Sequence, residues 1–130
     1  MTRDDLAALY AGYIDCLNRR DWDRLGDFVH PEAEHDGRRF GLDGYRAMLA
    51  ADVRAIPDLR FAVAFTVIEP PRIAARLDFD CHPAGALFGA QVNGRRVRFA
   101  ENVVYEVEAG LIVRVWSVID KAAVAAQAGA

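Results

Sequence analysis

The sequence has 130 residues, of which 53% are hydrophobic and 27% charged, and its formal net charge is −3. This length and balance are typical of one globular domain with its own core, and they exclude an intrinsically disordered chain. No repeat, linker or low-complexity segment divides the chain, so we expect a single domain over residues 1–130.

The sequence also argues against several partners and locations. No apolar run approaches the roughly 18 residues that span a bilayer, so no membrane association is expected. The basic residues are scattered along the chain, which argues against a nucleic-acid-binding surface. The N-terminus is polar and acidic, unlike a signal peptide, and Cys16 and Cys81 do not suggest a disulfide framework. We therefore expect a cytoplasmic protein.

Several catalytic residue types are nearly missing. Ser117 is the only serine and Lys121 the only lysine, and Ser117 lacks the flanking glycines of a nucleophile elbow. The three histidines have no zinc-ligand spacing, and the glycines match no phosphate-binding or dinucleotide-binding loop. The sequence therefore argues against a serine hydrolase, a zinc enzyme and a nucleotide enzyme, and it predicts neither a metal nor a cofactor. The side chains left as candidates for catalysis are carboxylates, histidines, tyrosines and arginines.

Helices are predicted in the first half of the chain. Apolar residues at three- and four-residue spacing predict an amphipathic helix over residues 3–20, with Thr2 as its N-cap. A short helix is expected near residues 21–29 and should end at His30-Pro31, because a residue before proline disfavours helical geometry. A third helix is expected over residues 42–55, before Pro57.

From residue 59 onward the hydrophobic period changes from that of a helix to that of a strand. Strands are predicted over residues 59–67, 73–81, 96–107 and 111–119, with a turn at Pro70-Pro71 and a closing helix over residues 121–127. Helices followed by hairpin-connected strands predict an α+β fold, with an antiparallel sheet covered by helices on one face.

Strand alternation places one carboxylate among apolar residues. Glu101 shares a face with Phe99, Val103 and Tyr105, so burial should raise its pKa. In the next strand, Trp116 and Asp120 are assigned to one face and Ser117 to the other, and both faces are largely apolar. We expect one face to line a pocket and the other to pack against a second subunit.

Each candidate site residue also has a structural interpretation. Asp120 lies where a strand ends and a helix begins, so it can be a pocket acid/base or a helix N-cap. Glu101 can face a ligand or pair with an arginine. His82 lies on the polar face of its strand and reaches a pocket only if a bulge re-aims it. The other candidates can line the pocket or belong to the core or an edge: His35, Tyr10, Tyr13, Phe99 and Trp116.

The segment from Phe99 to Asp120 resembles the C-terminal hairpin of SnoaL-like polyketide cyclases, also called predicted ester cyclases, of the NTF2-like superfamily. Its most specific feature is Trp116 followed four residues later by Asp120. Similar stretches cover nearly the whole chain: Leu17-Asn18, His35-Asp36-Gly37, Gly41 to Met48, Ile56 to Phe61 and Asn93 to Val97.

The resemblance implies a conical barrel in which N-terminal helices pack on a strongly curved antiparallel sheet that encloses a pocket. It also implies a homodimer formed through the sheet. Characterised members close a ring by intramolecular aldol addition in a polyketide methyl ester, without metal or cofactor, and the resemblance assigns Asp120 as general acid/base. His82 departs from the pattern: members often read Gly-Thr-His-x-Gly where this chain has Asp80-Cys-His-Pro-Ala-Gly85.

The expected function is a cofactor-free cyclase or isomerase, in which Asp120 and His82 act on a small apolar or carbonyl-bearing, polyketide-like ligand. The expected substrate-binding residues are Glu101, Trp116, His35, Tyr13, Tyr10 and Phe99. Two alternatives remain: another pocket enzyme, such as a dehydratase or epoxide hydrolase, and a non-catalytic binding or dimerisation module. An epoxide hydrolase would need an Asp-Arg-Asp cluster, and alternation places Asp78, Arg76 and Asp80 on the polar face.

Overall fold

The computed structural model describes residues 1–128. Its first half contains α1 (Arg3–Arg19), the 3₁₀ helix η1 (Trp22–Asp27), β1 (Val29–His35), β2 (Arg38–Arg39) and α2 (Gly41–Ala55). The second half contains β3 (Ala62–Glu69), β4 (Arg72–Cys81), β5 (Ala86–Leu87), β6 (Ala90–Gln91), β7 (Val97–Glu108), β8 (Leu111–Ile119) and α3 (Lys121–Ala128). The order of helices and long strands is as the hydrophobic period predicts.

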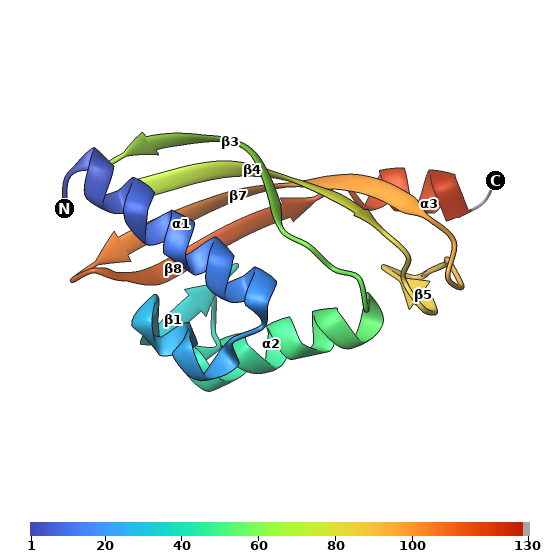
Figure 1. Cartoon of the computed structure of the whole chain (residues 1–130), viewed down its shortest axis with the longest axis horizontal. Coiled ribbons are helices and arrows are strands. Elements are labelled where there is room, and N and C mark those ends of the chain that lie inside the picture. The colour runs from blue at the N-terminus through green and yellow to red at the C-terminus, as the bar shows by residue number, and fades with distance from the viewer. Residues whose placement is uncertain (129–130) are drawn as a thin grey trace.

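The main sheet has six strands in the order β2-β1-β8-β7-β4-β3. It is strongly curved, with α1 and α2 on its concave side and α3 at its far end (Figure 1). The predicted α+β architecture, with helices packed on a curved sheet, is confirmed. The sheet does not close into a barrel, because its edge strands β2 and β3 do not pair with each other.

The sheet is mixed and not purely antiparallel as predicted. β1 runs parallel to β8, with Glu34 opposite Arg114 and His35 opposite Val115. Hydrophobic alternation does not predict β1, which contains Pro31. The pairing of β1 with β8 shifts register between Val29 and Glu34, and Pro31 falls in this interval. Its missing N–H therefore interrupts no regular hydrogen-bond ladder.

The predicted N-cap of the first helix is confirmed, whereas the second helix is shorter than predicted. Thr2 is the N-cap of α1, and its Oγ1 accepts from the Asp5 N–H at 3.1 Å while the Asp5 carboxylate accepts from the Thr2 N–H at 2.8 Å. This reciprocal pair satisfies free N–H groups at the helix start. The predicted helix near residues 21–29 is the shorter 3₁₀ helix η1, and β1 begins two residues after it ends.

A bulge in β8 decides which of its side chains face inward. Val107 pairs with Ile112, but Glu106 pairs with Arg114, so Val113 is an extra residue on the β8 side. One extra residue reverses the alternation of every side chain beyond it. Ser117 therefore lines the interior, whereas Trp116 is 43% exposed on the outer surface of the sheet.

The convex side of the sheet carries an apolar surface that no helix covers in residues 1–128. Val67, Ala74, Val104 and Trp116 form one row across four strands, because each is paired with the next. Phe65 and Val118 lie in the adjacent row, 58% and 69% exposed. We call these six residues the outer apolar face. None of the helices in the described residues is long and apolar enough to cross a membrane.

Candidate active site

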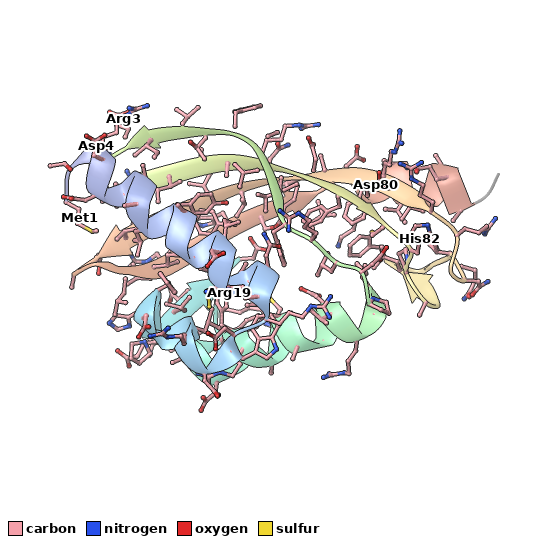
Figure 2. All side chains as sticks on the ribbon, viewed as in Figure 1. Met1, Arg3, Asp4, Arg19, Asp80 and His82 are labelled. Carbon is pink, nitrogen blue, oxygen red and sulfur yellow. The ribbon has the colours of Figure 1, made fainter. Side chains whose placement is uncertain are left out.

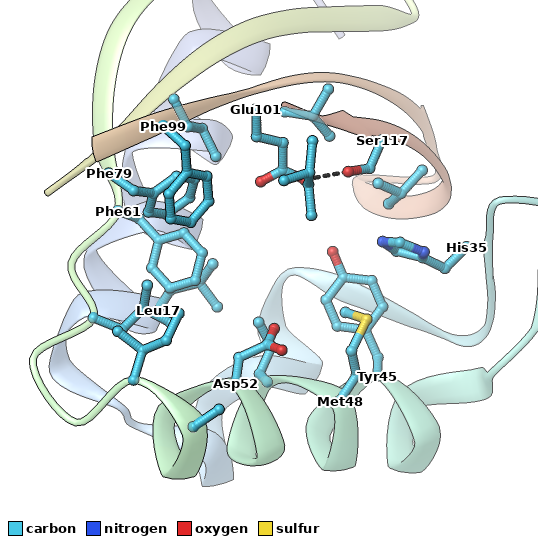
Figure 3. A pocket seen from close by; sticks show the side chains of 18 of the residues that line it. Leu17, His35, Tyr45, Met48, Asp52, Phe61, Phe79, Phe99, Glu101 and Ser117 are labelled. Atoms are coloured by element: carbon cyan, nitrogen blue, oxygen red, sulfur yellow. Dashed lines mark hydrogen bonds between the residues drawn. The ribbon is translucent and has the colours of Figure 1, made fainter. Parts of the chain in front are cut away.

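A cavity of about 190 Å³ lies between the concave side of the sheet and the helices α1 and α2 (Figure 3). Apolar side chains from α1, α2, β4, β7 and β8 form most of its wall. The polar side chains that line it come from α1, β1, α2, β7 and β8, and they are Tyr13, His35, Tyr45, Asp52, Glu101, Tyr105 and Ser117.

One part of the cavity wall is aromatic. Phe79 and Phe99 stack with ring centroids 5.0 Å apart, and Phe61 packs edge-on against Phe79 at 5.7 Å. Phe88, between β5 and β6, packs edge-on against Phe99 at 5.8 Å and is 41% exposed. Figure 3 shows the first three rings on the side of the cavity opposite His35. This wall suits a flat, apolar group.

Glu101 lies among the aromatic and aliphatic residues of β7, as alternation predicts, and its side chain points into the cavity (Figure 3). Its Oε2 accepts a hydrogen bond from the Ser117 hydroxyl on the neighbouring strand. Burial raises the pKa of the Glu101 carboxyl, the Ser117 hydrogen bond opposes this rise, and the charge of Asp36 adds to it. The predicted direction of the pKa shift is confirmed.

Asp52 faces the same cavity from α2, opposite Glu101 (Figure 3). Asp52 is partly exposed to solvent, and the rest of its side chain is enclosed by the protein atoms around the cavity. This burial, together with the negative charge of Glu101, raises the pKa of Asp52 to about 6. No protein group in residues 1–128 donates a hydrogen bond to this carboxylate, so its oxygens are free to contact a ligand.

All four tyrosines of the chain gather at the inner end of the cavity. The hydroxyls of Tyr13 and Tyr45 are 2.6 Å apart, and the Tyr10 hydroxyl donates to that of Tyr105 at 3.2 Å. Burial raises the pKa of each, in the case of Tyr10 to about 12. These hydroxyls therefore stay protonated at neutral pH and can donate hydrogen bonds.

His35 reaches the cavity from the end of β1. Its Nδ1 is 3.5 Å from a carboxylate oxygen of Asp36, and its ring stacks on Phe40. Burial lowers the pKa of His35 although the neighbouring Asp36 opposes this. The imidazole is therefore uncharged at neutral pH. The other oxygen of Asp36 accepts from the Ser117 backbone N–H at 2.9 Å, which ties β1 to β8 beside Glu101.

The sequence predictions place some candidates correctly and others not. Glu101, His35, Tyr13 and Phe99 line the cavity, and Tyr10 is buried behind Tyr105 without lining it. Thus α1, β1 and β7 bring these five residues to the cavity wall or directly behind it, with Phe99 and His35 on opposite sides. Their binding roles stay predictions.

Asp120 and Trp116 lie outside the cavity, contrary to the placement that alternation gave them. Trp116 belongs to the outer apolar face, because the β8 bulge turns it outward. Asp120 is exposed, and its Oδ1 accepts from the Ala123 N–H at 3.1 Å at the start of α3. This is the helix N-cap that the sequence offers as the alternative.

His82 also lies outside the cavity, at the end of β4 (Figure 2). Its Nδ1 is 2.8 Å from one Asp58 oxygen, and its backbone N–H donates to the other at 2.9 Å. No bulge turns it inward, because β4 pairs with β7 in unbroken register through Cys81.

The cavity wall in the described part of the chain contains neither a metal-binding cluster nor the Asp-Arg-Asp cluster of an epoxide hydrolase. No group of three His, Cys, Asp or Glu residues in the described part of the chain could hold a metal ion. Asp78 and Asp80 are exposed on the convex side, where Arg96 and Arg98 contact Asp80 and Arg76 donates to Asn102. The Asp-Arg-Asp cluster of an epoxide hydrolase is thus away from the cavity, as alternation predicts.

Sequence reasoning missed Asp52, Tyr45, Tyr105 and Ser117 as cavity residues. Asp52 is seven positions after Tyr45, with Met48 and Leu49 between them, so all four lie on the face of α2 that lines the cavity. An aspartate in that position is the signal that could have identified it. Ser117 needs the β8 bulge, which nothing in the sequence marks.

A helix-covered, strongly curved sheet around an apolar cavity with a few ionisable groups defines a protein of the NTF2-like superfamily. A family model described as SnoaL-like polyketide cyclase matches residues 7–128. The chain belongs to the SnoaL-like polyketide cyclase family, and this membership supports a cyclase role.

Solved structures agree with this assignment. A SnoaL-like polyketide cyclase from Agrobacterium tumefaciens is 49% identical over 98% of each chain, with a TM-score of 0.93. TsrD from Streptomyces laurentii is 25% identical, covering 99% of this chain and 98% of its own, with a TM-score of 0.87. IdmH from Streptomyces antibioticus shares the fold at 20% identity, with coverage of 95% and 98% and a TM-score of 0.83. Comparison with curated proteins found no match.

Proposed function

We propose that the chain is a cofactor-free cyclase or isomerase that moves a proton on a small carbonyl-bearing substrate. The observation that carries this proposal is the pair of carboxylates with raised pKa values, Asp52 and Glu101, facing one apolar cavity with tyrosine hydroxyl donors beside them. The proposal gives the acid/base role to Asp52 and leaves Asp120 as the cap of α3.

Asp52 has the properties that a general base at neutral pH needs. A base is most effective when its pKa lies near the working pH, and the pKa of Asp52 is raised to about 6. Among residues 1–128 no group donates a hydrogen bond to its carboxylate, so both oxygens can approach a C–H bond next to a carbonyl. The charge of Glu101 raises the pKa of Asp52, and the hydrogen bond from the Ser117 hydroxyl holds the Glu101 carboxylate in one orientation.

Tyr45 is the donor for the oxygen of the enolate. Its hydroxyl points into the cavity between Asp52 and Glu101 (Figure 3). When the enclosed Tyr13 hydroxyl donates to Tyr45, the proton of Tyr45 is free for a substrate oxygen. A donor placed where negative charge develops in an apolar site stabilises the transition state strongly.

The proposed cyclisation balances without another reactant. Asp52 removes a proton from the carbon next to one carbonyl, and the electron pair forms the enolate whose oxygen Tyr45 holds. The enolate carbon attacks a second carbonyl carbon of the same molecule, forming the new C–C bond and an alkoxide. The Asp52 carboxylic acid returns its proton to that oxygen. Substrate and product are therefore isomers.

Exchange of carbon-bound protons in D₂O tests the first step without the natural substrate. Phenylacetone and ethyl acetoacetate are enolisable probes, and NMR follows the loss of their α-proton signals. We expect exchange about 10²–10⁴-fold faster with the parent protein than with Asp52→Asn, which is the usual contribution of a positioned acid/base.

Asp120→Asn is the matched control, because it removes the same charge from an aspartate outside the cavity. It should exchange at the parent rate. The proposal is wrong if Asp52→Asn keeps the parent rate, or if the parent protein binds these ketones and does not accelerate exchange. The second outcome would favour a non-catalytic binding module.

We further propose that two copies of the chain pair through the outer apolar face. Phe65, Val67, Trp116 and Val118 are each at least 43% exposed on adjacent positions of the sheet, and exposed apolar patches of this kind mark interaction sites. Sedimentation velocity should show a dimer that Trp116→Glu dissociates. Ala11→Glu, on the exposed side of α1, should leave the dimer intact. A monomeric parent protein at micromolar concentration would refute the pairing.

A further inference from the structure

We infer that Asp36, which lies outside the cavity wall, is a positioning residue of the site: it decides which ring nitrogen of His35 carries the proton, and it fixes the backbone of Ser117. One of its carboxylate oxygens contacts each of these two residues. His35 therefore presents a hydrogen-bond acceptor to the cavity, and the Ser117 hydroxyl is kept on Glu101. Only the use of that acceptor in catalysis rests on the function proposed above.

The turn between β1 and β2 holds Asp36 in place. This turn has two residues, Asp36 and Gly37, and both have positive φ, 50° and 81°. Positive φ at both positions is the pattern of a type I′ hairpin turn, for which Asp-Gly and Asn-Gly are preferred pairs. The Asp36 N–H donates to the Val115 carbonyl at 2.8 Å, so the backbone sets where the carboxylate lies. The turn accounts for an aspartate or an asparagine at this position, but not for a negative charge.

The first oxygen of the Asp36 carboxylate acts on β8. β1 ends at His35, which is opposite Val115. Beyond that point, the Ser117 N–H donates to Asp36 Oδ1 at 2.9 Å. The hydroxyl of the same serine donates to Glu101 Oε2. Asp36 therefore fixes the backbone from which the hydrogen bond to Glu101 is made.

The second oxygen lies beside the ring of His35. Asp36 Oδ2 is 3.5 Å from His35 Nδ1, and the ring stacks on Phe40 and meets Tyr45 edge-on. Burial lowers the pKa of His35, so at neutral pH its ring carries a single N–H. The partner of one ring nitrogen sets the tautomer, and a carboxylate favours the proton on the nitrogen beside it. His35 is therefore protonated on Nδ1 and has its lone pair on Nε2.

This lone pair faces the cavity. Figure 3 shows the tip of the His35 ring directed into the space that Glu101, Ser117 and Tyr45 surround. In the cyclisation proposed above, the attacked carbonyl oxygen becomes a hydroxyl when Asp52 returns its proton. That hydroxyl needs an acceptor in an apolar cavity. Nε2 of His35 supplies one that carries no charge.

The tautomer of His35 tests the inference without any substrate. Long-range ¹H–¹⁵N NMR spectra distinguish a protonated from an unprotonated ring nitrogen, and the His35 signals are assigned from its backbone. We expect the proton on Nδ1 in the parent protein at pH 7.5. A parent protein with the His35 proton mainly on Nε2 would overturn the inference.

Asp36→Asn separates the charge from the turn. Asparagine before glycine suits the same turn, and its amide oxygen can still accept from the Ser117 N–H. Its NH₂ group can only donate to Nδ1, so the His35 proton should move to Nε2. Asp58→Asn is the matched control, because Asp58 lies 2.8 Å from Nδ1 of His82 outside the cavity. It should change the His82 signals and leave those of His35 unchanged. A His35 proton that stays on Nδ1 in Asp36→Asn would contradict the role of Asp36.

Amide exchange tests the contact with Ser117. Asp36→Gly keeps the turn, because glycine adopts positive φ freely, but it removes the carboxylate. The Ser117 N–H should then exchange with D₂O at least about tenfold faster than in the parent protein, as expected when a hydrogen bond to a charged group is lost. An unchanged amide exchange rate would refute this part of the inference.

These readouts need no turnover. If the Asp36 variants fail to fold, the tautomer of His35 in the parent protein still decides. The expected tautomers, in a protein that does not accelerate α-proton exchange of the ketone probes, would refute the proposed function alone. The opposite tautomer in a protein that does accelerate it would refute this inference alone.

Discussion

Replacing Asp52 with asparagine should stabilise the fold at neutral pH. The pKa of Asp52 is raised from its ordinary value of 3.8 to about 6, so the folded protein holds the ionised carboxylate less favourably than the unfolded chain does. A shift of roughly two units corresponds to about 3 kcal/mol at most. Water in the cavity screens the exposed side chain, so we expect about 1 kcal/mol. For a chain of this length that gain raises Tm by roughly 3–5 °C.

The pH dependence identifies the cause of the gain. The folded state binds the Asp52 proton more tightly, so the stability of the parent protein falls as pH rises from about 4 to about 6. The advantage of Asp52→Asn should therefore be full at pH 7.5 and should shrink towards pH 4. Thermal unfolding followed by circular dichroism across this range measures both variants. Asp78→Asn, an exposed substitution on the convex side, is the control. A variant that is less stable at pH 7.5, or a gain independent of pH, would refute this reasoning.

The remaining predictions concern the donor, the second carboxylate and the cap. Tyr45→Phe should slow proton exchange about 10²-fold by removing the hydrogen-bond donor, measured by the same NMR assay. Glu101→Gln should shift the acidic limb of the exchange pH profile to lower pH, because the charge of Glu101 raises the pKa of Asp52; an unmoved limb would contradict this coupling. Asp120→Ala should lose about 1 kcal/mol of stability in urea titration, through the lost N-cap, and keep the parent exchange rate.

The elements of the fold are largely readable from the sequence, because period and capping are local properties. The helix after Thr2 and the four long strands follow directly from them. β1 does not, because its pairing with β8 depends on contacts more than 75 positions apart in sequence, and its Pro31 argues against a strand. A proline is tolerated here only because the register is interrupted at that position.

The site residues also fall into two groups: those that a local pattern predicts and those whose position depends on strand pairing. Glu101 is predictable because β7 pairs with β4 without interruption from Arg72 to Cys81, so alternation holds along the strand. Asp52 is also predictable in principle from the helical face that it shares with Tyr45. The assignment of Asp120 to the pocket assumes the same alternation through all of β8, and the bulge at Val113 breaks it. No feature of residues 111–119 distinguishes a bulged from a regular strand.

The extra residue in β8 gives this fold a way to exchange one set of pocket groups for another. A β8 that kept Val113 but paired it with Glu106 in regular register would keep the same strands and the same sheet order, but Trp116 would turn inward and Ser117 outward beyond that point. Such a change of register would take the hydroxyl partner from Glu101 and rearrange the pocket wall in a single step. Homologous sequences can therefore keep a tryptophan-aspartate spacing while using different reactive groups, and transfer of catalytic residues between relatives should first establish whether β8 is bulged between the β7–β8 turn and that tryptophan.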